Sequence, residues 1–203
     1  MIVIVDYGLG NLMAFKNIYN QLNFKSIISS DPAVLKEASK IILPGVGSFD
    51  FAMSSLNNSG LRATLDELIL IKKIPVLGVC VGMQMMAKSS EEGELNGLGY
   101  VNGLVKKFSM EQKMHPKPLP HMGWNEVFHS KDNMLFESII NGKRFYFLHS
   151  YYFECDNKEA IAFTSYGQKF TCGIKNENIY GVQFHPEKSH DVGTLLLKNF
   201  GNL

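Results

Sequence analysis

The amino-acid sequence predicts an α/β fold, in which an open, mostly parallel, flavodoxin-like sheet is flanked by helices and carries an added antiparallel portion. In the first ninety residues, short apolar runs rich in valine and isoleucine alternate with segments of helical periodicity. Such alternation is typical of βαβ units, whose parallel strands are buried on both faces. After residue 97, strand-like runs follow one another with only short turns between them, which indicates the antiparallel portion.

The first half supplies alternating strands and helices. Asp31 followed by Pro32 predicts a helix start, because aspartate caps helices and proline suits the first helical position. Residues 8–11 lack the third glycine of a dinucleotide-binding loop, so they indicate a turn and a helix cap. Strands are expected at residues 2–7, 25–29, 40–43 and 76–79, and helices at 11–22, from 31 onward, at 48–57 and at 61–73.

The second half carries the remaining strands and one helix. Residues 109–122 contain three prolines and form the long irregular stretch, which predicts a surface loop with a function. Strands are expected at residues 97–108, 124–128, 144–152, 160–165, 169–175 and 180–184, and a final helix at 192–199.

Length and composition fit one globular domain over residues 1–203. The formal net charge is +1 and basic residues do not cluster, so no nucleic-acid-binding face is expected. The three cysteines show no C-x-x-C spacing, and the start of the chain lacks the features of a signal peptide. The longest uncharged run, residues 74–87, is too short to span a bilayer. We therefore expect a cytoplasmic protein with free thiols and no membrane contact.

Cys80 lies where an apolar strand ends and helical periodicity begins, between Gly78 and Gly82. This is the G-x-C-x-G form of the nucleophile elbow, a strained turn that lifts one side chain above the edge of a sheet. The glycines leave room for the crowded backbone, and the N-terminus of the following helix favours a thiolate. The alternative is a buried structural cysteine, which is a common fate of this residue type.

A cysteine nucleophile needs a base, and the base needs a partner that orients it. His185 follows a convincing core strand, and Glu187 lies two residues further on, so both side chains can face the same way. Pro186 between them stiffens this arrangement, and the carboxylate would hold the imidazole in the required tautomer. A solvated surface turn is the alternative interpretation.

A tetrahedral intermediate also needs hydrogen-bond donors for its oxyanion. The N–H of Val81 is one candidate, and the loop formed by Gly45, Val46 and Gly47 after the third strand is the other. A plain strand-to-helix turn would account for the same glycines. No motif for a cofactor or a metal is found.

Taken together, these segments resemble the class I, triad-type glutamine amidotransferases. GVCVGMQ at residues 78–84 is similar to the nucleophile motif of that family, and QFHPE at 183–187 to its His-Glu motif. Further segments narrow the resemblance to the glutaminase subunits of histidine biosynthesis. They are DYG at 6–8, GNL at 10–12, LPGVGSF at 43–49, PHMGWN at 120–125, FLHSY at 147–151 and HPEKS at 185–189. The resemblance extends over the whole chain and implies the fold of that family.

The resemblance implies a role for each matching residue. Cys80 would attack the side-chain amide of L-glutamine to form a thioester, His185 would transfer the protons, and Glu187 would orient His185. Gln84, Ser150 and Tyr151 would line the glutamine pocket. Gly45, Val46 and Gly47 match the oxyanion strand, which in this subgroup is thought to need a peptide flip driven by the partner.

The resemblance also implies a heterodimer with a (β/α)8 cyclase subunit. That subunit uses the ammonia to make imidazole glycerol phosphate and an aminoimidazole carboxamide ribotide. Tyr146, Lys188, Met122 and Trp124 match positions near the exit toward it, although simple core packing would also explain Met122 and Trp124.

Two departures and three competing functions accompany the resemblance. Val81 stands where leucine is usual, and residues 108–119 do not match the histidine-pathway enzymes clearly. A paralogous glutaminase serving a surface-sugar amidine synthetase would share the same motifs. A non-catalytic relative that only binds a partner is a second possibility, which the joint presence of Cys80, Gln84, His185 and Glu187 argues against. A cysteine peptidase is a third, which Gln84 and the absence of an obvious peptide cleft in the sequence argue against.

Overall fold

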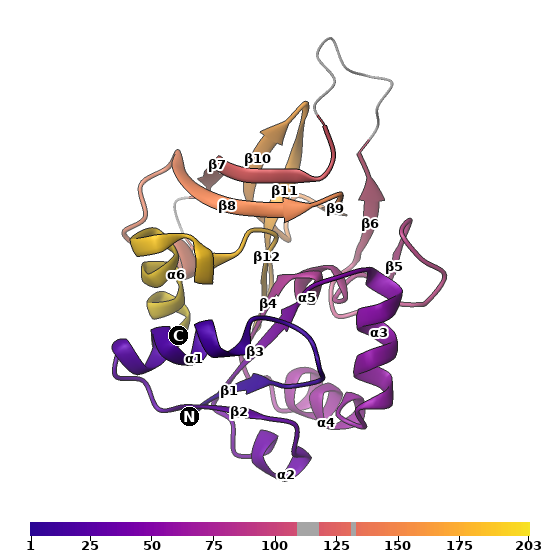
Figure 1. The fold of residues 1–203 in the computed structure, drawn as a ribbon, viewed down its shortest axis with the longest axis vertical. Helices are drawn as coiled ribbons and strands as arrows, with labels where there is room; N and C mark the ends of the chain where they lie inside the picture. Colours follow the sequence, from indigo (N-terminus) through magenta and orange to yellow (C-terminus); the bar gives the residue numbers. More distant parts are fainter. Residues whose placement is uncertain (109–117, 131–132) are drawn as a thin grey trace.

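A parallel sheet with the strand order β2–β1–β3–β4–β12 forms the centre of the fold in the computed structural model, which describes residues 1–108, 118–130 and 133–203 (Figure 1). This order is the flavodoxin-like one, in which ligands bind beyond the carboxyl ends of the strands. Its strands are β1 (Ile2–Val5), β2 (Ser26–Ser29), β3 (Lys40–Gly45), β4 (Val76–Cys80) and β12 (Ile179–Val182). The predicted fold class is confirmed.

Helices cover both faces of the parallel sheet. Helices α1 (Leu12–Gln21) and α6 (His190–Asn202) lie on one face, and α3 (Phe49–Asn58) and α4 (Arg62–Asp66) lie on the other (Figure 1). The short helix α2 (Pro32–Leu35) begins as predicted, because the Asp31 carboxylate accepts the N–H of Ala33 at 2.8 Å. Among the described residues, no helix has the length and the apolar character that crossing a membrane requires.

The antiparallel portion continues from β12. Strand β11 (Gln168–Asn176) pairs with β12 and leads to β10 (Ala160–Tyr166), β7 (His121–His129) and β8 (Lys143–His149). A branch from β11 contains β9 (Tyr151–Cys155) and β6 (Gly103–Lys107), and the two-residue β5 (Ser89–Ser90) pairs with β6 in parallel. Two 3-10 turns, η2 (Met134–Phe136) and η3 (Pro186–Lys188), complete this half.

Several predicted elements differ from the observed ones. The strand expected at 144–152 is broken at Ser150, so that β8 pairs with β7 whereas β9 pairs with β6. Of residues 97–108 only β6 is a strand, because Gly97, Leu98 and Val101 donate their N–H groups to carbonyls of residues 85–88 instead. The irregular stretch expected at 109–122 falls largely on residues 109–117, outside the described residues, and its end belongs to β7.

The helices also differ in length. The helix expected at 61–73 becomes α4 followed by a π-helix, η1 (Glu67–Ile71), in which Lys72 donates its N–H to the Glu67 carbonyl. The wider turn keeps Leu68 and Ile69 buried. Helix α5 (Val81–Gln84) after Cys80 has only four residues.

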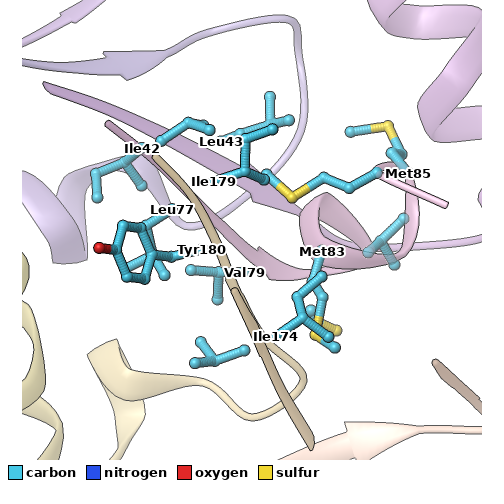
Figure 2. Packing of buried hydrophobic residues seen from close by; sticks show 14 of the residues in the cluster. Ile42, Leu43, Leu77, Val79, Met83, Met85, Ile174, Ile179 and Tyr180 are labelled. Atoms are coloured by element: carbon cyan, nitrogen blue, oxygen red, sulfur yellow. The ribbon is translucent and has the colours of Figure 1, made fainter. Parts of the chain in front are cut away.

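The core lies between the parallel strands and their helices. Figure 2 shows Ile42 of β3 on the same side of the sheet as Leu77 and Val79 of the adjacent parallel strand β4. All three are at most 1% exposed. Burying a side chain of this kind stabilises the fold by about 1.5–3 kcal/mol. The carboxyl ends of β3 and β4 are therefore firmly held, and functional groups placed there have a rigid support.

Candidate active site

Cys80 ends β4 in a conformation that L-amino acids rarely adopt, with φ 55° and ψ −114°. Such backbone costs about 1–3 kcal/mol and persists only where its surroundings hold it. The flanking glycines make the turn compatible with close packing. A Cβ at Gly82 would lie 2.0 Å from the Leu43 carbonyl oxygen, and one at Gly78 would lie 2.7 Å from the Gly82 oxygen. The turn has the elbow geometry that the sequence predicts.

Cys80, His185 and Glu187 are brought together, as expected. The Nδ1 of His185 lies 2.8 Å from Oε1 of Glu187, and both side chains are almost fully buried. The His185 side chain also hydrogen-bonds with Cys80. The backbone N–H of His185 donates to the Tyr146 carbonyl at 2.8 Å, which fixes the histidine against β8.

The electrostatics of the three side chains favour a charged pair. Burial opposes protonation of His185, but its hydrogen bonds with Cys80 and Glu187 outweigh burial and raise its pKa to about 10. An imidazolium beside the sulfur stabilises a thiolate, which is the reactive form of cysteine. For the other two cysteines, burial has the dominant effect on the thiol. Burial raises the pKa of Cys155 to about 12 and that of Cys172 well above its usual value.

A pocket of about 240 Å³ opens above Cys80. This volume is below the range of about 300–1,000 Å³ that drug-sized ligands need, and it suits a small metabolite. The lining contains the predicted residues Cys80, Val46, Gly47, Val81, Gln84, Ser150, Tyr151, His185 and Lys188, together with Glu92, Pro120, Leu148 and His149. Gly45 lies beneath the pocket, where it pairs with Cys80 between β3 and β4.

The candidate oxyanion loop leaves β3 directly beside the elbow. A Cβ at Gly45 would lie 2.4 Å from the Gly82 nitrogen, so only glycine permits this approach. The Tyr7 hydroxyl donates to the Pro44 carbonyl at 2.5 Å and holds the base of the loop. Gly47 has φ 92°, a conformation that glycine adopts without strain. The donors assigned to this loop and to Val81 stay predictions.

Three polar side chains of the site were not identified as functional from the sequence. Glu92 is the carboxylate in the pocket lining, and its Oε2 accepts the Phe49 N–H at the start of α3 at 2.8 Å. Gln183 is fully buried and donates from Nε2 to the Cys80 sulfur at 3.8 Å. His149 ends β8 beside the pocket and is buried. Gln183 and His149 could have been found from their place in the motifs at 183–187 and 147–151, and Glu92 from its acidic turn.

The residues expected near a partner lie on one surface at the pocket mouth, which we call the rim surface (Met122, Trp124, Tyr146, Leu148 and Lys188). Met122 pairs with Leu148 and Trp124 with Tyr146 across β7 and β8. The Lys188 Nζ lies 5.8 Å from the centre of the Tyr146 ring. Met122 is 65% and Trp124 38% exposed, so core packing does not explain them. A contiguous exposed apolar surface beside a pocket marks an interaction site.

Metal-binding side chains do not gather in the described ranges, which contain no cluster of three or more histidine, cysteine, aspartate or glutamate residues able to hold an ion. The site has an imidazole that contacts both a thiol and a carboxylate. Such a set can open an acyl bond through a covalent thioester.

Comparisons with known proteins agree with this geometry. A family model described as "Glutamine amidotransferase class-I" matches residues 3–202. "Imidazole glycerol phosphate synthase subunit HisH" of Leptospira interrogans is 53% identical over 204 residues, covering 100% of both chains. The protein of that name from Bdellovibrio bacteriovorus is 52% identical with the same coverage. A solved structure of a putative GMP synthase subunit from Thermoplasma acidophilum has a TM-score of 0.73 at 20% identity, covering 99% of this chain and 92% of that one.

Proposed function

The chain belongs to the class I glutamine amidotransferases, and from that membership we propose how its pocket releases ammonia from glutamine. It is the glutaminase subunit of an imidazole glycerol phosphate synthase, and it serves histidine biosynthesis together with a cyclase subunit. We propose that residues 1–203 act as one catalytic domain and that the protein works in the cytoplasm, which suits its free thiols.

The single observation that carries the mechanism is the buried Cys80–His185–Glu187 arrangement at the strained end of β4. The thiolate attacks the side-chain carbonyl carbon of glutamine, and a C–S bond forms. When the C–N bond breaks, His185 gives its proton to the leaving nitrogen, and ammonia departs. His185, now neutral, takes a proton from water, whose oxygen attacks the thioester and releases glutamate. The thiolate and the imidazolium are thereby restored.

The remaining lining groups bind the substrate and the intermediate. Glu92 is placed to bind the α-ammonium group of glutamine, and Gln84, Ser150 and Tyr151 line the same pocket. The Val81 N–H, at the start of α5, is one oxyanion donor. The second comes from the loop of Gly45, Val46 and Gly47 after a peptide flip that the bound partner drives. Donors aimed at the developing charge are usually a large contribution to such catalysis.

The rim surface supports a direct passage of ammonia to the partner. Ammonia must stay unprotonated to act as a nucleophile, so release into water would waste it. We propose that a (β/α)8 cyclase subunit covers Met122 and Trp124, forms a heterodimer with this chain and receives the ammonia near Tyr146 and Lys188. The competing functions receive no comparable support. The relatives are named for imidazole glycerol phosphate synthase, the triad is intact, and a pocket of about 240 Å³ leaves little room for a peptide.

Replacement of the nucleophile tests the mechanism. In the complex with the cyclase subunit, Cys80→Ala should abolish glutamine-dependent synthesis and leave ammonia-dependent synthesis intact. Cys155→Ala, which removes a half-buried thiol outside the pocket lining, serves as the control. Retention of glutamine-dependent turnover by Cys80→Ala would show that the triad assignment is wrong. Failure of a thiol-alkylating glutamine analogue to label Cys80, with and without the partner, would favour a non-catalytic binding protein.

A further inference from the structure

We infer that Gln183 is a positioning residue of this site, which donates a hydrogen bond to the Cys80 sulfur and fixes the direction of the Gln84 amide. The role toward Gln84 rests on the proposed function, because it concerns glutamine binding. The role toward the sulfur depends on the contacts around Cys80 alone. Both follow from hydrogen-bond donors and acceptors that can be assigned without ambiguity.

The assignment starts from the backbone carbonyl of Tyr151, which can only accept hydrogen bonds. The Gln84 Nε2 lies 3.1 Å from this oxygen, so the amide nitrogen and not the amide oxygen faces it. The second hydrogen of Gln84 Nε2 points to Oε1 of Gln183 at 2.9 Å. Turning the Gln84 amide over would oppose two acceptors at Tyr151. The Gln84 Oε1 is therefore the end left to meet a substrate.

The orientation of Gln183 follows in turn. Its Oε1 accepts from Gln84, so its Nε2 is the end that faces the Cys80 sulfur, at 3.8 Å. Turning the Gln183 amide over would place two NH₂ groups against each other. Gln183 is fully buried, so solvent does not compete for these hydrogen bonds. The sulfur therefore has a neutral donor in addition to His185.

The Tyr151 carbonyl is itself held from the other side. His149 donates to it from Nδ1 at 2.7 Å, and its Nε2 then accepts from Nδ1 of His121 at 2.9 Å. Burial lowers the pKa of His149 to about 3, so the imidazole stays neutral and keeps this tautomer. Asn125 contributes its Nδ2, 3.2 Å from Nε2 of His121. The carbonyl that orients Gln84 and Gln183 is thus fixed by strands β7 and β8.

The donor matters because another neighbour of the sulfur favours the thiol. The Leu148 carbonyl oxygen lies 3.7 Å from the Cys80 sulfur, where it can accept from S–H but opposes a negative charge. The N–H of Gln183 offsets this effect in the thiolate. Among the described residues, the charged or titratable groups around Cys80 are His185 and Glu187 after β12, His149 at the end of β8, Tyr151 at the start of β9, Tyr7 after β1, and Glu92 and Lys188 in the pocket lining.

Alkylation of the full chain by iodoacetamide across a range of pH tests the donor role, with the site identified by peptide mass spectrometry. The sulfur displaces iodide, so the rate follows the thiolate. Gln183→Met keeps the volume and removes both hydrogen bonds. For Gln183→Met we expect the pH at which alkylation reaches half its maximal rate to be about one unit higher than for the wild type. At pH values below the wild-type midpoint, this shift corresponds to an alkylation rate about tenfold lower. Gln183→Glu places a negative charge beside the sulfur, and its midpoint should rise further.

Two comparisons separate this role from a structural one. Asn199→Asp changes another buried amide, which donates to the Leu135 and Glu137 carbonyls and has no hydrogen bond to Cys80, and should leave the midpoint unchanged. In the complex with the cyclase subunit, Gln183→Met should raise KM for glutamine. Gln183→Glu should have a KM for glutamine closer to the wild-type value than that of Gln183→Met, because its carboxylate still accepts a hydrogen bond from Gln84.

An unchanged alkylation midpoint in a Gln183→Met protein with a native circular dichroism spectrum overturns the inference. Should Gln183→Met not fold, Gln183→Asn retracts the amide by one methylene and must show a shift in the same direction. These outcomes are distinct from failure of the proposed function. Iodoacetamide needs no glutamine pocket, whereas a wild-type Cys80 that resists the glutamine analogue contradicts the glutaminase assignment and leaves the alkylation result standing.

Discussion

Glu187→Gln isolates the charge of the carboxylate from its hydrogen bond, because the amide oxygen can still accept from His185. The two groups are 2.8 Å apart, and at an effective dielectric constant of about 20 their attraction amounts to about 6 kcal/mol. Relaxation reduces the measured loss, and removing one partner of a buried pair typically costs about 3–5 kcal/mol. This loss destabilises the resting imidazolium and the thiolate beside it, so kcat/KM for glutamine should fall by about two to four orders of magnitude.

The assay compares glutamine-dependent with ammonia-dependent synthesis in the complex with the cyclase subunit. Only the glutamine-dependent rate should fall, since the cyclase reaction does not use Glu187. Glu177→Gln is the control, because Glu177 forms an exposed ion pair with Lys73 at 2.7 Å and should change neither rate. A kcat/KM within tenfold of the wild type, in a folded protein, would refute the view that the buried charge drives proton transfer.

The same substitution changes the pH dependence of folding. The pKa of His185 is about 10 in the folded chain, above its ordinary value of 6.5. A raised pKa contributes stability that is complete below pH 6.5 and is lost as the pH rises toward 10. Glu187→Gln lowers this pKa, so its free energy of unfolding should decline less steeply over that window. Urea unfolding at several pH values measures both slopes, and parallel slopes would contradict the assignment.

Three further substitutions address folding and partner binding. The pKa of His149 is about 3 in the folded chain, below its ordinary value of 6.5. The free energy of unfolding should therefore fall by about 1.4 kcal/mol for each pH unit below 6.5. In urea unfolding at several pH values, His149→Asn should show a smaller fall over this range. Gly82→Ala places a Cβ 2.0 Å from the Leu43 oxygen and should cost about 3 kcal/mol or more, whereas Gly60→Ala, with φ 75° and open space, should cost about 1–2 kcal/mol. Equal losses would contradict the close approach. Trp124→Ala should weaken binding of the cyclase subunit by about 2 kcal/mol, or about 30-fold, in a titration. Phe128→Ala, at the other end of β7, should leave this binding unchanged. Weaker binding by Phe128→Ala and unchanged binding by Trp124→Ala would show that the interface lies at the other end of β7.

The features of this protein that can be predicted are those that depend on short, continuous stretches of sequence. Alternating strands and helices predict the parallel sheet, and residues at strand ends, such as Cys80 and His185, are recognisable because such ends meet at one edge. The break at Ser150 is not predictable in this way, because it depends on which strand pairs with each half. The contacts that Glu92 and Gln183 make are not predictable for a related reason. Their partners lie 43 and 99 residues away, so no local pattern contains both members of either contact.

Strand β8 imposes a limit on how this protein can change over evolution. Tyr146 and Leu148 point toward the rim surface, whereas Phe145, Phe147 and His149 alternate with them and are buried. The backbone of the same strand holds His185 through the Tyr146 carbonyl. Insertion or deletion of one residue would exchange the two faces of the strand and move its carbonyls away from the histidine. Homologous lineages should therefore substitute residues in β8 freely only on the outward face, while preserving its length. Chimeras that exchange partner specificity should replace outward side chains and leave the strand register intact.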